Sequence, residues 1–125
     1  MSNPTILVVA SFMAALAVGL GAFGAHALEE SLSPKRLETW NTAVTYHMWH
    51  ALALIGLALV SRVFEVDLTW SLNLILVGIF IFSGSLYLLC LIDTSWLGAI
   101  TPIGGICFIL GWILAGWKFI TFFFF

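Results

Sequence analysis

Four long apolar stretches occupy almost the whole of this chain, and they constrain its fold more than any other feature. They cover approximately residues 5–28, 41–61, 70–92 and 102–123. A transmembrane helix needs roughly 20 apolar residues, so each stretch can cross a bilayer. Hydrophobic residues make up 62% of the chain and charged residues 8%, against about 45–50% and 25% in soluble domains.

The class of fold follows from the behaviour of a backbone in lipid. Only helices and closed barrels satisfy every backbone polar group there, and the sequence has no strand alternation. The sequence therefore predicts an all-α integral membrane bundle of four transmembrane helices in a single domain. Short connections make helices that follow each other in sequence antiparallel neighbours.

The first stretch has one alternative interpretation, a cleaved signal peptide. Ala25-His26-Ala27 resembles the small-residue cleavage site of such a peptide. However, no Lys or Arg precedes the apolar run, and the run is longer than the apolar region of a signal peptide. We expect this stretch to remain as a membrane helix.

The few charges and cysteines exclude several classes of partner. The net charge is −2 with four Lys and Arg residues, so we expect no nucleic-acid partner. Cys90 and Cys107 both lie inside apolar stretches and are interpreted as packing residues. We expect no metal and no cofactor. Lys35 and Arg36 on one side nearly balance Arg62 and Lys118 on the other, so charge alone does not orient the chain.

A histidine at membrane depth, His50, is the most informative polar residue. An ionisable side chain in a span is a hypothesis of a functional site by default. Tyr46 lies four residues earlier and shares its helix face. His47 points roughly 60° away from His50, so we expect it to lie elsewhere, at the interface. The candidate polar residues gather in the half of the membrane next to the first and third loops: His26, Tyr46, His50, Ser83, Ser85, Tyr87 and Thr101.

Two interpretations of these residues stay open. They can be hydrogen-bonding residues that hold helices together, or they can line one polar pocket for a ligand. In both, we expect His50 to be neutral and hydrogen-bonded, with Tyr46 or a serine of the third span as partner. We expect all seven side chains to converge in the interior of this half of the bundle, open toward the first and third loops, with His26 too near the interface to reach His50 directly.

Small residues recur at helical spacing and predict close helix packing. Gly19 to Gly24 also spell a dinucleotide-binding fingerprint, but that motif requires a turn between a strand and a helix, which is absent here. The candidate packing residues are Ala14, Ala17, Gly21, Gly24, Gly84, Gly104, Gly105 and Gly111.

These observations favour a non-enzymatic accessory or interaction subunit, since no set of nucleophile, base and acid is visible. Its expected partners are the lipid bilayer and a protein partner or further copies of the chain. The alternative is a binder or transporter of a lipid, quinone, metal or solute that uses the polar half of the bundle.

Four motifs in order also resemble one known family, the small four-helix membrane proteins called domain of unknown function 423, which is similar to the transmembrane protein 256 group. The resemblance covers essentially the whole chain, and it implies a multi-pass protein of the bacterial inner membrane with both termini in the cytoplasm. It brings no catalytic residues, and His47 lies outside its motifs. The motifs are GAFGAH at residues 21–26, Thr42, Tyr46 and His50 before ALAL, FSGSLY at residues 82–87, and TPIGG at residues 101–105 with Gly111-Trp112.

Overall fold

The computed structural model describes residues 3–125, which form four long helices and one short 3-10 helix. All four long helices are long and apolar enough to cross a membrane, which confirms the predicted fold class. The helices are α1 (Asn3–His26), α2 (Pro34–Phe64), α3 (Thr69–Ile92) and α4 (Thr101–Phe124), with η1 (Ser95–Ala99) before the last.

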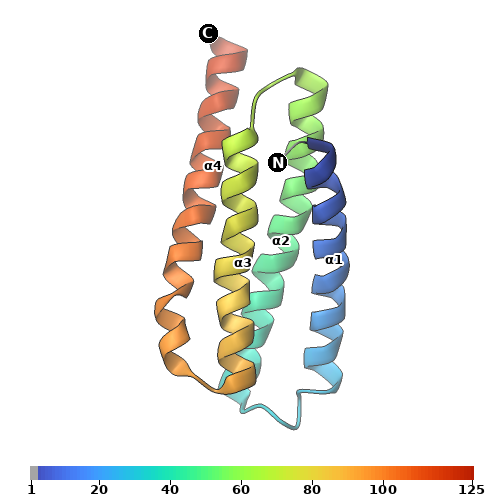
Figure 1. Ribbon diagram of the computed structural model, residues 1–125, viewed down its shortest axis with the longest axis vertical. Coiled ribbons are helices and arrows are strands. Elements are labelled where there is room, and N and C mark those ends of the chain that lie inside the picture. The colour runs from blue at the N-terminus through green and yellow to red at the C-terminus, as the bar shows by residue number, and fades with distance from the viewer. Residues whose placement is uncertain (1–2) are drawn as a thin grey trace.

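The helices pack in the order of the sequence. α1 packs on α2, α2 on α3 and α3 on α4, whereas α1 does not pack along α4 within the described residues. The α1–α2 and α3–α4 connections lie at one end, and the α2–α3 connection and the C-terminus lie at the other (Figure 1). Sequential helices are therefore antiparallel neighbours as predicted, with α1 and α4 as the outer helices of the set.

α2 is longer than the predicted second span. Its 31 residues begin at Pro34 and form one continuous helix, whereas the predicted apolar span covers residues 41–61 only. The Ser33 hydroxyl caps its start by accepting the Arg36 N–H at 3.2 Å. At 1.5 Å per residue the helix is about 46 Å long, and a hydrocarbon core is about 30 Å thick. α2 is therefore longer than a hydrocarbon core is thick.

Glycines permit the closest helix contacts. A Cβ on Gly24 would lie 2.5 Å from the Trp40 indole, and a Cβ on Gly111 would lie 2.7 Å from Ile75. Gly104 is the tightest, because a Cβ there would overlap the backbone of Phe82 on α3. Gly78, which the small-residue pattern missed, makes room for the ring of Phe108 in the same way.

The other candidate packing residues differ in how closely they contact a neighbouring helix. Ala17 is fully buried, Ala14 is half-buried, and a Cβ on Gly21 would lie 3.2 Å from Val44. A Cβ on Gly105 would make only an ordinary contact with Phe82. Gly84 differs from the expectation, because a Cβ there would meet no atom within 4 Å. It borders an open crevice and not another helix.

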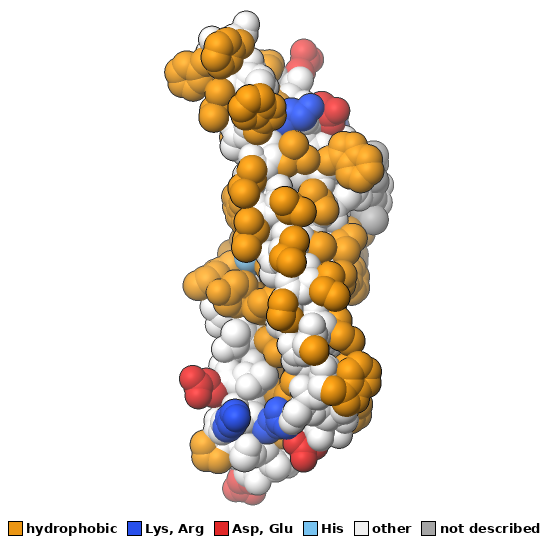
Figure 2. Space-filling model, turned by 90° about the vertical axis from the view of Figure 1, so that its left-hand side faces the viewer, with side chains coloured by type: hydrophobic (Ala, Val, Ile, Leu, Met, Phe, Trp, Pro, Cys, Tyr) orange, Lys and Arg blue, Asp and Glu red, His pale blue; other side chains and the backbone are white. Residues whose placement is uncertain are grey.

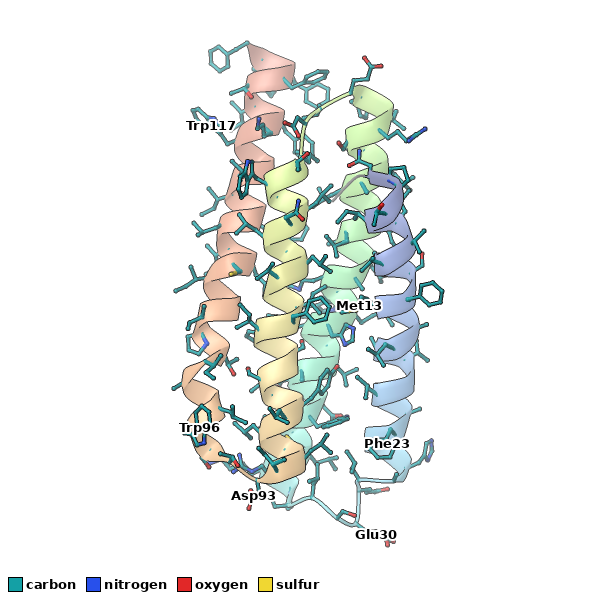
Figure 3. All side chains as sticks on the ribbon, in the orientation of Figure 1. Met13, Phe23, Glu30, Asp93, Trp96 and Trp117 are labelled. Atoms are coloured by element: carbon teal, nitrogen blue, oxygen red, sulfur yellow. The ribbon has the colours of Figure 1, made fainter. Side chains whose placement is uncertain are left out.

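The surface matches a membrane environment. Apolar side chains cover the middle of the face shown in Figure 2, and charged side chains gather toward its two ends. Trp96 lies near the end with the first and third connections, and Trp117 lies toward the opposite end (Figure 3). Tryptophans at two levels are typical of the aromatic belts of membrane proteins.

Candidate functional site

His47 is the most buried histidine, although the sequence placed it at the interface. Its side chain is 1% exposed, and its Nδ1 lies 2.8 Å from the Tyr87 hydroxyl of α3. The expectation was wrong because α2 lies between α1 and α3 and buries a broad sector of its surface. The signal was present in the sequence as a buried stripe at three- and four-residue intervals: Trp40, Ala43, His47, Ala51, Leu54 and Ala58.

Ser83 and Trp40 complete the polar contacts around His47. The Ser83 hydroxyl donates to the Ala43 carbonyl at 2.7 Å. The Trp40 indole N–H donates to the Leu20 carbonyl of α1 at 2.9 Å, and its ring packs on Tyr87 with a centroid distance of 4.8 Å. These contacts join α1, α2 and α3 at one level of the membrane.

His50 lies on the other side of α2 and uses both of its ring nitrogens. Nδ1 lies 2.8 Å from the Tyr46 carbonyl, and Nε2 accepts the Trp112 indole N–H at 3.1 Å. An indole N–H can only donate, so Nε2 carries no proton and Nδ1–H donates to Tyr46. His50 is therefore neutral and hydrogen-bonded, as expected. Its partners are the backbone carbonyl of Tyr46 and the indole of Trp112, which was not among the candidate polar residues.

Aromatic rings surround His50 and line a groove between α2 and α4. The Phe108 ring stacks on the imidazole with a centroid distance of 3.7 Å and an interplanar angle of 14°. The groove has a volume of about 450 Å³. Its lining residues are Tyr46, His50, Phe82, Gly105, Phe108, Ile109, Trp112 and Ile113.

A second, shallow groove of about 450 Å³ shares Tyr46 with the first and follows α2 toward the first loop, with all of its lining residues on α2. It is lined by Pro34, Leu37, Glu38, Asn41, Thr42, Thr45 and Tyr46. The hydroxyls of Thr42 and Thr45 donate to backbone carbonyls of their own helix. The Tyr46 hydroxyl makes no hydrogen bond within residues 3–125, although the Tyr46 ring packs on Phe82 with a centroid distance of 4.6 Å. The two grooves together change from polar to apolar with depth.

Ser85 and Thr101 form a third, separate contact. Their hydroxyl oxygens lie 2.6 Å apart, and Ser85 also donates to the Phe82 carbonyl at 3.0 Å. Residues two apart on a helix point to nearly opposite sides. Ser83 accordingly faces α2, while Ser85 faces the start of α4.

His26 does not reach the interior. It is exposed at the last residue of α1, so the expectation that its side chain faces the bundle interior is wrong. The helix ends there, and the chain turns away toward the first connection (Figure 1). The expected convergence of the seven candidate residues is therefore wrong, because their side chains face different neighbouring helices. They form separate groups: Tyr46 with His50, Ser83 with Tyr87 around His47, Ser85 with Thr101, and His26 alone.

The chemistry that these groups offer is hydrogen bonding and ring stacking. Among the described residues no group of three or more His, Cys, Asp or Glu side chains is placed to hold a metal ion. The Cys90 thiol donates to the Arg36 carbonyl at 3.2 Å, near the ion pair between Arg36 and Asp93 at 3.0 Å. The fold and these contacts define a small polytopic membrane protein with two aromatic-lined histidines.

Comparison with known proteins agrees with that class. The family model described as "Protein of unknown function (DUF423)" matches residues 20–105, and the chain belongs to this family. It is 46% identical over 108 residues to a UPF0382 membrane protein of Staphylococcus epidermidis, covering 86% of this chain and 88% of the relative. It is 47% identical over 110 residues to the UPF0382 membrane protein YwdK of Bacillus subtilis, covering 86% and 89%. No solved structure shows a significant match.

Proposed function

We propose that this protein is a non-enzymatic binder of one amphiphilic lipid, held in the joined grooves along α2. The observation that carries the proposal is the change in lining from the first loop toward the membrane interior. Asn41, Thr42 and Thr45 lie at the outer part, and Tyr46 lies at the junction. Phe108, Ile109 and Ile113 line the inner part. This order matches the head and chain of a lipid.

The dimensions and charge restrict the ligand further. Each groove has a volume of about 450 Å³, and small-molecule sites run from about 300 to 1,000 Å³. The one charged side chain among the lining residues is Glu38. An acidic side chain repels an anionic head, so the preferred head is uncharged or zwitterionic. The Tyr46 hydroxyl supplies a donor at the boundary between head and chain.

The matched test compares two glycine substitutions. Gly105 lines the inner groove, and a Cβ there would make only an ordinary contact, so Gly105→Leu should fold and obstruct the groove. Gly116, where a Cβ would meet nothing within 4 Å, provides the control Gly116→Leu outside the groove. Native mass spectrometry of protein extracted with its membrane lipids should show one retained lipid in the wild type and control, and its loss in Gly105→Leu. Equal lipid retention by all three proteins contradicts the proposal.

An accessory subunit is the second candidate, with a partner's transmembrane helix in the same groove. Gly105 on the groove surface favours this candidate, since small residues let helices approach closely. α4 also favours it, because α4 packs on α3 but not along α1 in the described chain and so keeps a side open to another helix. Co-purification from native membranes separates the candidates. A stoichiometric protein lost from Gly105→Leu favours the accessory role, while a lipid alone favours the binder.

The proposed location is the bacterial inner, or plasma, membrane with both termini in the cytoplasm. The family resemblance supports this orientation, and the α2–α3 connection lies at the same end as the C-terminus (Figure 1). Two reporters can be fused after Phe125, one that is active only in the cytoplasm and one that is active only outside it. The cytoplasmic reporter should be active and the external one inactive. Activity of the external reporter alone would reverse the proposed orientation.

A further inference from the structure

A narrow crevice that shares no lining residue with the lipid groove lies beside His47. It has a volume of about 100 Å³ and runs between α1 and α3, with His47 of α2 among its lining residues. Met13, Leu16 and Leu20 line it from α1, and Ile79, Phe80, Ser83, Gly84 and Tyr87 line it from α3. α1 packs closely on α2 but not along α3 in residues 3–125. The crevice therefore opens sideways, toward the bilayer.

His47 brings an unused polar atom to this crevice. Its Nε2 is buried without a hydrogen-bond partner among the described residues. Met13 lies at the gap between α1 and α3 (Figure 3). Its backbone carbonyl approaches the imidazole of His47, but a hydrogen bond of normal geometry is not formed.

The contact with Tyr87 decides which proton His47 carries. The Tyr87 hydroxyl has one hydrogen and lies 2.8 Å from Nδ1, and that hydrogen has no other acceptor among the described residues. A phenol that donates to Nδ1 leaves the proton of a neutral imidazole on Nε2. The buried Nε2–H is then a donor without an acceptor, which buried polar groups in proteins rarely are.

We propose that this crevice binds the carbonyl group of a flat, lipid-soluble molecule of the quinone class, with His47 Nε2–H as its hydrogen-bond donor. The donor requires an acceptor oxygen, and the lining side chains Leu16, Leu20, Ile79 and Phe80 require an otherwise apolar ligand. Gly84 leaves open space in the same crevice, since a Cβ there would meet no atom within 4 Å. This site is separate from the lipid groove of the proposed function.

Depth favours a quinone over the ester carbonyl of an ordinary lipid. His47 is the fourteenth residue of a helix of 31 residues that begins at Pro34, so it lies within about one turn of the helix middle. Ester carbonyls lie at the edge of a hydrocarbon core that is about 30 Å thick. A quinone ring carries its carbonyls into the core.

The test uses the full chain, labelled with ¹⁵N-histidine, in lipid nanodiscs, with decylubiquinone as the probe. We expect a saturable downfield shift of the His47 Nε2–H proton as the mole fraction of decylubiquinone rises. Decylbenzene, which lacks a carbonyl, should leave this resonance in place. The resonances of His26 and His50 serve as internal references in the same spectra.

Two substitutions locate the effect. Gly84→Leu adds a side chain to the crevice lining at a position where the Cβ meets no atom within 4 Å, and it should raise the half-saturating quinone fraction by about tenfold or more. Gly116→Leu lies outside the crevice and should behave as the wild type. Gly105→Leu should leave the quinone shift unchanged, so failure of this site and failure of the lipid groove are distinguishable.

The remaining outcomes also decide the proposal. Without quinone, the Nε2–H chemical shift can be compared between nanodiscs of ester-linked and of ether-linked lipids. A difference between the two assigns the carbonyl to a bilayer lipid and overturns the assignment to a quinone. The Nε2–H resonance can also show a bond to water or to the Met13 carbonyl and no response to decylubiquinone. That result overturns the proposed site. A quinone shift that persists in Gly84→Leu places the ligand elsewhere and contradicts the proposal.

Discussion

The Trp112 indole N–H donates to His50 Nε2 across the α2–α4 groove at a distance of 3.1 Å. This bond fixes His50 in one neutral form, because its Nε2 must accept and its Nδ1 must donate. It also links α2 to α4, beside the Phe108 ring that stacks on the same imidazole. A charged imidazolium has no lone pair on Nε2 and would break the contact.

Trp112→Phe should destabilise the protein by about 1 kcal/mol, since it removes a donor and leaves the buried Nε2 without a partner. Unfolding in a titration with denaturing detergent measures the change. Trp117→Phe is the control, because Trp117 is 61% exposed and its indole makes no hydrogen bond within residues 3–125. Equal effects of the two substitutions would show that the His50 bond contributes nothing specific.

Gly104 and Gly105 are adjacent and should respond very differently to alanine. A Cβ on Gly104 overlaps the Phe82 backbone, which cannot move aside as a side chain can, while a Cβ on Gly105 makes an ordinary contact. Overpacking of this kind costs about 1–3 kcal/mol. Gly104→Ala should therefore lower the melting temperature in detergent clearly, and Gly105→Ala should leave it nearly unchanged. A reversed order would mean that α3 and α4 pack in another register.

Most of the architecture was predictable because lipid allows few alternatives. The apolar stretches located all four helices, and short connections placed sequential helices side by side. The length of α2 was less accessible: residues 35–41 are mixed in polarity, and hydropathy cannot show that a helix continues into the headgroup region. The Ser33 cap was the signal for its start, and it lies one residue before Pro34.

The site was harder to predict, because a depth measured along the chain does not say which way a side chain faces. Ser83 and Ser85 lie at similar depths but point to different helices. His47 and His50 lie one turn apart, yet they border separate cavities on two sides of α2. The partner of His50 comes from Trp112, 62 residues away, and nothing local to either residue specifies that contact.

Asp67 offers a pH-dependent contact outside the membrane. Its carboxylate accepts the Thr69 N–H at 3.0 Å, and hydrogen bonds from Thr69 lower the pKa of this carboxyl below its usual value. The contact stabilises the fold above the unfolded-state pKa of Asp67, and this stabilisation is lost as pH falls through the lower folded-state value. Thr69→Val should move the Asp67 pKa upward in a carboxyl NMR titration. An unchanged pKa would show that the Thr69 hydroxyl has no part in the shift.

Arg36 joins the start of α2 to the α3–α4 connection. Its Nε donates to Asp93 Oδ1 at 3.0 Å and its Nη2 donates to Ser95 Oγ at 2.9 Å. Asp93 has a positive φ of 50°, a conformation that Asn also tolerates. Asp93→Asn therefore removes the charge while keeping the turn.

The Arg36–Asp93 coupling should be small and sensitive to salt. The two side chains are 21% and 82% exposed, and exposed ion pairs contribute about 0.2–1 kcal/mol. A double-mutant cycle of Arg36→Gln and Asp93→Asn should give a coupling energy in that range, and it should shrink as ionic strength rises. Ser95→Ala in the Asp93→Asn background should lower stability further, because Arg36 still holds Ser95. A coupling energy that does not change with salt would mean that the pair acts through the turn at Asp93 and not through charge.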